Sequence, residues 1–340
     1  MRILVATDAW RPQTNGVVYT YEYLAEEIRG RGGEILFLTP QDFHTVPCPT
    51  YPEIRLAIGT PRSAGRHVEA ASPDYIHIAT EGPIGLMTRS YCRKARLPFT
   101  TSYHTRFPEY IAARFPIRES WCYAYQRRFH NSGDGMMVAT RSLRELLKSR
   151  GFKNILDWSR GVDTELFRPR EVALFGNREP VFLYVGRVSI EKNVEAFLRL
   201  DLPGSKVVVG GGPQLEQLKA AYPSVRFTGP KYGEDLARCY ASCDAFVFPS
   251  LTDTFGLVLL EAMASGLPVA ALPVTGPIDV LGGTDAGVID NDLRKAALAA
   301  LKLDPKRCRE HALNYSWARS ARQFVDNIEK AQRPPLQKAA

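Results

Sequence analysis

Residues 246–271 read FVFPSLTDTFGLVLLEAMASGLPVAA, and this stretch decides the fold that the sequence predicts. The apolar run at 245–248 has the length and composition of a buried parallel strand, which a Pro-Ser pair ends. Residues 255–264 predict a helix, and a Gly and a Pro separate it from a second strand at 269–271. A strand, loop, helix and strand in this order form one unit of a parallel α/β sheet, with the helix beginning at the carboxyl edge of the strands.

Two carboxylates flank the start of this helix and suggest a ligand. The first N–H groups of the helix, near Gly256, would lack partners within the helix and would attract an anion. Asp253 lies beside the helix start, and Glu261 lies two turns along the helix. A carboxylate on each side of an anion site suits a diphosphate with hydroxyls at both ends. The pattern therefore predicts a nucleotide-sugar, with a ribose on one side and a hexose on the other.

The same stretch resembles the signature of the retaining glycosyltransferases of family 4, an acidic residue followed by seven residues and a Glu. The resemblance implies the GT-B fold, an α/β architecture of two doubly wound Rossmann-like domains that face each other across a cleft. It implies that Glu261 binds the donor ribose and that Asp253 holds the hexose. Backbone amides of Thr254, Phe255 and Gly256 would contact the phosphates and the sugar. Members often have Glu where this chain has the shorter Asp253, a difference that bears on which hexose is bound.

Two cations follow another predicted strand, at 181–185. Arg187 directly follows Gly186, and Lys192 lies five positions further, on a loop that leads into a helix. Alone, such charges are usually solvated, but beside the acidic pair they predict a diphosphate clamp that stabilises a departing nucleotide diphosphate without a metal ion. The resemblance assigns both cations to the donor phosphates. Gly229 ends a further strand at the same sheet edge, where ligands of open α/β sheets bind.

The amino-terminal part shows the same alternation of strands and helices. A strand at 3–8 leads through a Gly-containing loop to a helix at about 19–29, the opening unit of a doubly wound domain. A plain tight turn is the simpler interpretation of Gly16, but the resemblance places this loop against the donor diphosphate. Residues 40–73 are rich in Pro and polar side chains, and we expect an irregular stretch with at most short strands, whose loops recognise the acceptor.

His104 ends a predicted strand at 99–104. A single His in such a place is usually structural. In family 4 a His of the N-terminal domain faces the sugar, and His104 matches its position. The resemblance implies a positioning role, because the family has no established protein nucleophile and the departing phosphate is proposed to take the acceptor proton. Arg160 and Asp163, in WSRGVD, are further candidates for the cleft.

The alternation of elements divides the chain into two predicted domains. Residues 1–170 would bind the acceptor, and residues 171–315 would bind the nucleotide-sugar. A last helix, at about 316–333, returns to the N-terminal domain in the family, and residues 334–340 are expected to form a disordered tail.

Composition bears on partners and location. Nearly all of the net charge of +8 belongs to the first half of the chain, which suits an anionic partner or merely solubilises the protein. Residues 105–133 interleave aromatic and arginine side chains, as in a membrane interface, a nucleic-acid surface, or a helix with its aromatics turned inward. The six cysteines include no C-x-x-C pair, no apolar run approaches ~20 residues, and we expect no signal peptide. We expect a cytoplasmic protein, peripheral on the cytoplasmic face of the membrane, with no nucleic-acid partner.

The motifs WSRGVD and TDTFG together resemble the branch that contains diacylglycerol glycosyltransferases and lipid mannosyltransferases. We expect a hexose or hexuronate to pass from a UDP-sugar co-substrate to a lipid such as diacylglycerol, with neither cofactor nor metal ion. Alternatives are a GDP-mannose donor and a polysaccharide or lipopolysaccharide acceptor.

Two other classes of protein stay open. A nucleotide-sugar 2-epimerase shares the architecture and would consume donor without an acceptor. A non-enzymatic membrane- or nucleic-acid-binding protein would bind its partner without Arg187 and Glu261. A dinucleotide oxidoreductase is disfavoured, because no G-x-G-x-x-G follows a predicted strand.

Overall fold

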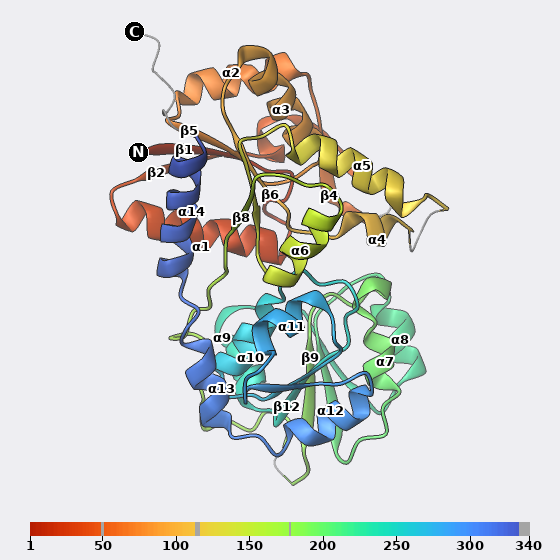
Figure 1. The fold of residues 1–340 in the computed structure, drawn as a ribbon. Helices are drawn as coiled ribbons and strands as arrows, with labels where there is room; N and C mark the ends of the chain where they lie inside the picture. The colour runs from red at the N-terminus through yellow and green to blue at the C-terminus, as the bar shows by residue number, and fades with distance from the viewer. Residues whose placement is uncertain (49–50, 113–115, 177, 333–340) are drawn as a thin grey trace. The chain divides into compact units, whose positions relative to one another are not determined.

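The computed structural model describes residues 1–48, 51–112, 116–176 and 178–332, which form two compact units (Figure 1). Unit 1 contains Met1–Arg160 and the chain from Trp317 onward, and unit 2 is Gly161–Ser316. The chain thus leaves unit 1 after Arg160, before the boundary expected after residue 170. The expected tail at 334–340 lies outside the described residues.

Unit 1 is built on a parallel six-stranded sheet in the order β2-β1-β5-β6-β7-β8. Its strands are β1 (Arg2–Ala6), β2 (Glu34–Leu38), β5 (Tyr75–Ile78), β6 (Thr100–Ser102), β7 (Gly135–Val138) and β8 (Ile155–Asp157). Its helices are α1 (Gly16–Gly30), α2 (Pro61–Ala71), α3 (Pro83–Ala95), α4 (Phe107–Ala112), α5 (Glu119–His130), α6 (Arg141–Ser149) and α14 (Trp317–Ala331).

Side-chain alternation along β1 separates two apolar cores in unit 1. Ile3 and Val5 pack with residues of α1 and α14, whereas Leu4 and Ala6 pack with residues of α2 and α3. Because successive side chains of a strand point to opposite faces, an uninterrupted apolar strand requires helices on both faces of the sheet. The sheet therefore has the doubly wound arrangement that the sequence predicts.

The carboxyl-terminal helix α14 returns to unit 1, as predicted, and is fastened there at both ends. At its start the ring of Trp317 stacks on Tyr23 of α1 with the ring centroids 4.9 Å apart. Just beyond its end, the amide of Gln332 donates to the carbonyl oxygen of Ile76 at 3.0 Å and accepts from its N–H at 3.3 Å. Figure 1 shows α14 (blue) beside α1 (red).

Residues 40–73 are more regular than expected, and the expectation of irregular loops is wrong. A 3₁₀ turn, η1 (Pro40–Asp42), is followed by the antiparallel hairpin of β3 (His44–Cys48) and β4 (Tyr51–Ile58), and then by α2 against α3. Reciprocal hydrogen bonds between Thr60 and Ser63 form a capping box at the start of α2, with Pro61 in its first turn. These starting signals outweigh the Pro-rich composition.

Unit 2 carries a second parallel six-stranded sheet, in the order β11-β10-β9-β12-β13-β14. Its strands are β9 (Val181–Val185), β10 (Ser205–Val209), β11 (Arg226–Gly229), β12 (Ala245–Phe248), β13 (Val269–Ala271) and β14 (Gly287–Ile289). Its helices are α7 (Val194–Leu198), α8 (Leu215–Ala221), α9 (Gly233–Ala241), α10 (Leu257–Ala264), α11 (Thr275–Leu281), α12 (Leu293–Ala300) and α13 (Pro305–Ala312), with the 3₁₀ turn η2 (Ile190–Lys192).

Each sheet has one point at which the strand order reverses. The chain runs outward in one direction from β9 to β11 and in the other from β12 to β14, so β9 and β12 are the central neighbours of unit 2. The corresponding pair in unit 1 is β1 and β5. Open α/β sheets bind ligands beyond the carboxyl ends of the strands at this point.

Two observations concern location. The helices of the described residues include none with the length and apolar character needed to cross a membrane. Cys92, Cys122, Cys239, Cys243 and Cys308 are free thiols.

The packing of α14 generates a stability prediction. Phe324 is fully buried against Trp158, with the ring centroids 4.9 Å apart, so Phe324→Ala should lower the free energy of unfolding of unit 1 by about 3–5 kcal/mol. Arg322→Ala, an exposed change on the same helix, should alter it by less than about 0.5 kcal/mol. Denaturant unfolding of both variants measures the difference, and equal losses would show that α14 does not complete this core.

Candidate functional site

The predicted donor residues of unit 2 lie on the loops that follow β9 and β12, at the point where the strand order reverses. Lys192 ends η2, after β9, and its Nζ lies 2.6 Å from Oδ1 of Asp253 in the loop after β12. Both side chains are partly buried. Two residues that the sequence singled out sixty-one positions apart are therefore joined by one ion pair.

Further contacts hold these two loops in place. Asn193, in the left-handed conformation at φ +52°, donates from its side chain to the carbonyl oxygen of Pro249 at 3.1 Å. The hydroxyl of Thr275 donates to the backbone oxygen of Asp253 at 2.9 Å. A Cβ atom added at Gly276 would lie 2.6 Å from the carbonyl oxygen of Phe255, so only glycine allows this close approach. The loop that carries Asp253 is consequently anchored from two sides.

The glycines of the predicted donor site bring backbone segments close together. Gly186 ends β9 beside Gly210, where an added Cβ would lie 1.9 Å from the carbonyl oxygen of Gly186. Gly256 has φ +86° and precedes α10, so this helix begins two residues later than the sequence predicts, without a side-chain cap. Gly229 closes β11, and its carbonyl oxygen accepts from the N–H of Gly210 at 3.0 Å.

Several buried polar atoms near the ion pair have no hydrogen-bond partner among the described residues. They are Oγ of Ser189, Oγ1 of Thr252 and Oδ2 of Asp253. Buried polar atoms in folded proteins nearly always have partners, and exceptions call for a ligand, a water or a functional reason. Atoms from both loops are thus arranged as if to receive hydrogen bonds from a bound molecule.

Glu261 lies in α10 and is held by a tyrosine that the sequence did not single out. The fully buried Tyr240 of α9 donates its hydroxyl to Oε2 of Glu261 at 2.8 Å. Burial raises the pKa of Glu261 to about 7, although the hydrogen bond from Tyr240 acts in the opposite direction. The hydroxyl of Tyr240 thus fixes one carboxylate oxygen of Glu261. The carboxylate is then suited to accept hydrogen bonds from a pair of sugar hydroxyls.

In unit 1, His104 follows a central strand made almost entirely of polar residues. Thr100, Thr101, Ser102 and Tyr103 are all fully buried, unlike the Val-, Ile- and Leu-rich strands usual in such sheets. Alternation sends Thr100, Ser102 and His104 to one face of the sheet and the other two to the opposite face. Each face accordingly carries its own hydrogen-bond network.

The first network joins His104 directly to Tyr21 and Arg160, and through Tyr21 to His77. The hydroxyl of Tyr21, on α1, lies 3.0 Å from Nε2 of His104 and 2.9 Å from Nε2 of His77. Nη2 of Arg160 lies 3.3 Å from Nδ1 of His104. Burial, and then the charge of Arg160, hold the pKa of His104 well below its ordinary value. His104 is consequently a neutral ring with a hydrogen-bond partner at each of its two nitrogens.

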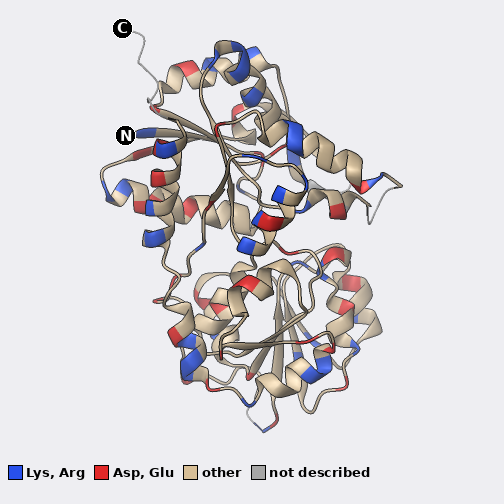
Figure 2. Cartoon of the chain, in the orientation of Figure 1, with Lys and Arg blue, Asp and Glu red and all other residues tan. Residues whose placement is uncertain are grey.

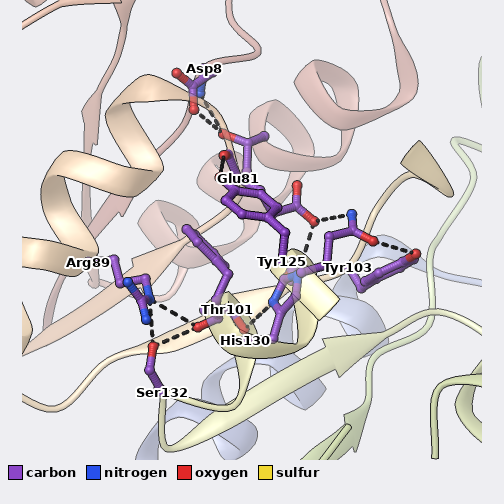
Figure 3. Close-up of polar contacts among 12 residues, drawn as sticks. Asp8, Glu81, Arg89, Thr101, Tyr103, Tyr125, His130 and Ser132 are labelled. Carbon is purple, nitrogen blue, oxygen red and sulfur yellow. Dashed lines mark hydrogen bonds and ion pairs between the residues drawn. The ribbon is translucent and has the colours of Figure 1, made fainter. Parts of the chain in front are cut away.

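The second network, on the opposite face, fixes the strand that carries His104 (Figure 3). His130 of α5 lies 2.9 Å from the Thr101 hydroxyl and 3.0 Å from Oε1 of Glu81. The amide of Gln126 bridges Glu81 and the hydroxyl of Tyr103. Because Tyr103 immediately precedes His104, this network fixes the backbone from which the His104 ring projects.

Two of the predicted site residues, Gly16 and Asp163, lie where local structure already uses the polar groups. Asn15 caps α1 by accepting from the N–H groups of Val17 and Val18, which occupies two of the donors beside Gly16. The carboxylate of Asp163, in unit 2, accepts from the N–H groups of two following residues and closes a turn. Arg160, in unit 1, is 4% exposed, and its guanidinium lies 4.1 Å from the centroid of the Trp158 ring.

Sequence reasoning missed Tyr21, His77 and Tyr240. The signal for His77 was available, since it interrupts the apolar strand β5 and is fully buried. The two tyrosines gave no comparable signal, because an aromatic side chain on the inner face of a helix is ordinary core. Among the described residues, no group of three or more His, Cys, Asp or Glu side chains is placed to hold a metal ion.

Comparisons with known proteins agree with this geometry. The sequence profile "Glycosyltransferase Family 4" matches residues 14–166, and "Glycosyl transferases group 1" matches residues 179–303. GDP-mannose-dependent alpha-mannosyltransferases from Mycobacterium tuberculosis and Corynebacterium glutamicum are 29% and 30% identical, over 85% and 90% of this chain and 83% and 82% of theirs. Alpha-monoglucosyldiacylglycerol synthase from Streptococcus pneumoniae is 28% identical over 92% of this chain and 81% of its own.

Solved structures extend the likeness to the whole fold. Sucrose-phosphate synthase from Thermosynechococcus elongatus superimposes with a TM-score of 0.77 at 20% identity, covering 97% of this chain and 98% of the other. With two parallel six-stranded sheets and a carboxyl-terminal helix that returns to unit 1, the chain belongs to the retaining glycosyltransferases of family 4 and has the GT-B fold.

Proposed function

We propose that this glycosyltransferase binds its nucleotide-sugar on the loops after β9 and β12 of unit 2 and transfers the hexose to a lipid acceptor at a membrane surface. The observation that carries the proposal is the 2.6 Å ion pair between Lys192 and Asp253, which joins the two loops. Buried atoms of Ser189, Thr252 and Asp253, on the same two loops, have no hydrogen-bond partner in the described part of the chain. A diphosphate and a sugar ring would supply partners to both the cation and the acceptor atoms.

The roles of the donor residues follow from their charges. Arg187 and Lys192 would hold the diphosphate and stabilise the negative charge that grows as the bond to the sugar breaks. Three N–H groups allow the ammonium of Lys192 to contact a phosphate while it keeps its bond to Asp253. Asp253 would then accept from hexose hydroxyls, and Glu261 from those of the ribose. The two cations would perform the task that a metal ion performs in other transferases, so we propose metal-independent transfer.

The choice of donor rests on the relatives. The mycobacterial and corynebacterial relatives, which match over more than four-fifths of both chains, are named for GDP-mannose. This likeness leads us to propose GDP-mannose as the first donor to test and the UDP-sugar expected from the sequence as the second. Asp253 in place of a longer Glu leaves about one methylene more room beside the hexose.

A lipid acceptor is supported by the surface of α5. Tyr123 and Phe129 of this helix pack inward, but Trp121 is 67% exposed and Tyr125 47% exposed. The exposed Arg118, Arg127 and Arg128 accompany them, and Figure 2 shows the basic residues on the helices of unit 1. An exposed Trp within a basic helix is suited to the boundary between anionic headgroups and acyl chains. We therefore place the protein at the cytoplasmic face of an anionic membrane.

A transfer assay tests the proposal as a whole. The purified protein is incubated with GDP-mannose or UDP-glucose and with vesicles of diacylglycerol in phosphatidylglycerol, and the lipid products are separated. We expect a glycosylated lipid from one nucleotide only, with activity retained in the presence of a chelator. Conversion of the donor to its epimer without vesicles would contradict transfer, and full loss with chelator would contradict the metal-independent clamp.

Removing one cation tests the diphosphate clamp. Arg187→Ala should lower kcat by roughly 100-fold or more, because the charge on the leaving diphosphate loses a preorganised partner. Arg199→Ala removes an exposed arginine that pairs with Glu195 on α7, and it should leave turnover within about twofold. Near-normal turnover of Arg187→Ala in the same assay would end the assignment.

The raised pKa of Glu261 yields a prediction about pH. Between its ordinary pKa of 4.5 and a folded-state pKa of about 7, the folded protein binds more protons at Glu261 than the unfolded chain does. Glu261 therefore destabilises the fold increasingly as the pH rises through this window. Glu261→Gln should raise Tm by a few °C at pH 8, and the gain should shrink toward pH 4.5.

Thermal scans with and without nucleotide complete this test. The wild type should gain stability from the donor nucleotide, by about 2.7 kcal/mol at one hundred times its dissociation constant. Glu261→Gln should lose most of that gain, because its amide presents a donor where the ribose hydroxyls need an acceptor. A gain in Tm that does not depend on pH, or a full response to nucleotide, would refute the role of Glu261.

A further inference from the structure

Five side chains of unit 1 form a continuous series of hydrogen bonds in which His104 lies between Arg160 and Tyr21. Arg160 contacts Nδ1 of His104, Nε2 of His104 contacts Tyr21, and Tyr21 contacts Nε2 of His77. Nδ1 of His77 lies 2.8 Å from the hydroxyl of Thr100. Tyr21 and His77 are fully buried, and Arg160 is 4% exposed. Both ring nitrogens of each histidine therefore have protein partners.

Each hydrogen bond of this series has a fixed donor and acceptor, and Arg160 determines which group donates. A guanidinium only donates hydrogen bonds, so Nδ1 of His104 must be the acceptor of this contact. A neutral imidazole carries a single proton, which must then be on Nε2. Nε2–H of His104 donates to the oxygen of Tyr21, 3.0 Å away. His104 is thus held as the Nε2–H tautomer.

The donor and acceptor roles of Tyr21 in turn determine which nitrogen of His77 carries the proton. With its oxygen accepting from His104, its hydroxyl proton points to the nearest remaining acceptor, Nε2 of His77 at 2.9 Å. The hydroxyl of Ser102 is farther from Tyr21, at 3.4 Å, and lies 3.0 Å from the same nitrogen of His77. His77 then carries its proton on Nδ1 and donates it to Thr100. The two histidines are therefore opposite tautomers.

The charged groups around the series keep both rings neutral. Besides burial, the positive charge of Arg160 and the neighbouring His130 lower the pKa of both histidines, and His77 also lowers the pKa of His104. The pKa of His77 falls to about 3. Glu81, the acidic group that acts on Tyr21, is itself occupied by His130 and Gln126. No ion pair links Arg160 to a carboxylate in the described part of the chain, so its charge stays directed at His104.

We propose that Tyr21 and His77 are positioning residues that hold His104 as the neutral Nε2–H tautomer, with its Nδ1 edge as the acceptor for a hydroxyl of the sugar. The contact of Nδ1 with Arg160, at 3.3 Å, is longer than the contact of Nε2 with Tyr21, at 3.0 Å, so Nδ1 is the edge that can take up a new donor. The catalytic consequence rests on the proposed function, whereas the tautomer does not. His104 would recognise a hydroxyl by accepting its hydrogen bond, and a sugar that lacks this hydroxyl would lose the contact.

The tautomers can be read directly by NMR. Long-range ¹⁵N–¹H correlation of protein labelled at histidine distinguishes Nε2–H, Nδ1–H and imidazolium, and the variants His77→Gln and His104→Gln assign the two rings. His311 serves as an internal standard, because its Nε2 faces the carbonyl oxygen of Val280 at 2.7 Å and must carry a proton. At pH 7 we expect Nε2–H for His104 and Nδ1–H for His77, with neither ring titrating between pH 5.5 and 8.

Tyr21→Phe tests the positioning role. The Nε2 proton of His104 should lose its acceptor and its signal should move upfield, while kcat falls roughly 10-fold with little change in the KM of the donor. Tyr91→Phe is the control, since it removes a tyrosine hydroxyl that donates to Glu69 at 2.6 Å and belongs to neither network. It should leave the His104 signal in place and kcat within about threefold.

Each outcome decides a separate point. A His104 protonated on Nδ1, or charged at pH 7, overturns the proposed donor and acceptor roles in the series. An unchanged kcat in Tyr21→Phe, or an equal loss in Tyr91→Phe, overturns the positioning role. If the wild type turned over no nucleotide-sugar, the proposed function would fail while the NMR spectra still reported the tautomers.

Discussion

A polar strand in the middle of a parallel sheet has no access to water, so each of its side chains must find a partner in the protein. Unit 1 meets this constraint at β6, where Thr100 and Ser102 turn to one face and Thr101 and Tyr103 to the other. Their partners come from α1, α5 and the end of α14. The same constraint aligns His104, so the network that stabilises the sheet also fixes a residue of the proposed site.

Unit 2 also has a parallel six-stranded sheet, but its polar residues are placed differently. Its central strands β9 and β12 are almost wholly apolar, and polar residues lie on the loops beyond them. Asn193, Thr275 and Gly276 hold these loops while atoms of Ser189 and Asp253 stay unpartnered. Rigid loops with unsatisfied acceptors lower the entropy cost of binding, since the site is formed before the ligand arrives. In the proposed function, unit 1 thus supplies a fixed contact for the sugar, and unit 2 supplies preformed loops for the phosphates.

Local patterns predicted most of this arrangement, and contacts distant in sequence account for the rest. The strands, the returning helix and the residues Lys192, Asp253 and Glu261 were accessible, because apolar runs, glycines and acidic spacing are visible within short windows. Tyr21 meets His104 across 83 positions, and Tyr240 reaches Glu261 only because α9 packs on α10. The prediction that residues 40–73 are irregular was wrong for a different reason. It gave more weight to their Pro-rich composition than to Thr60 and Ser63, which cap α2.

The discontinuity of unit 1 has a consequence for synthesis on the ribosome. The strands of unit 1 emerge first, but Phe324 and Ile328, which close its core around Trp158, are translated only after all of unit 2. At ~5–20 residues per second, the apolar face of the sheet waits roughly 10–30 s for its last helix. Unit 2, continuous in sequence, can fold within that interval. The first half to be translated is therefore the last to be completed, and during that interval its apolar sheet face is open to aggregation.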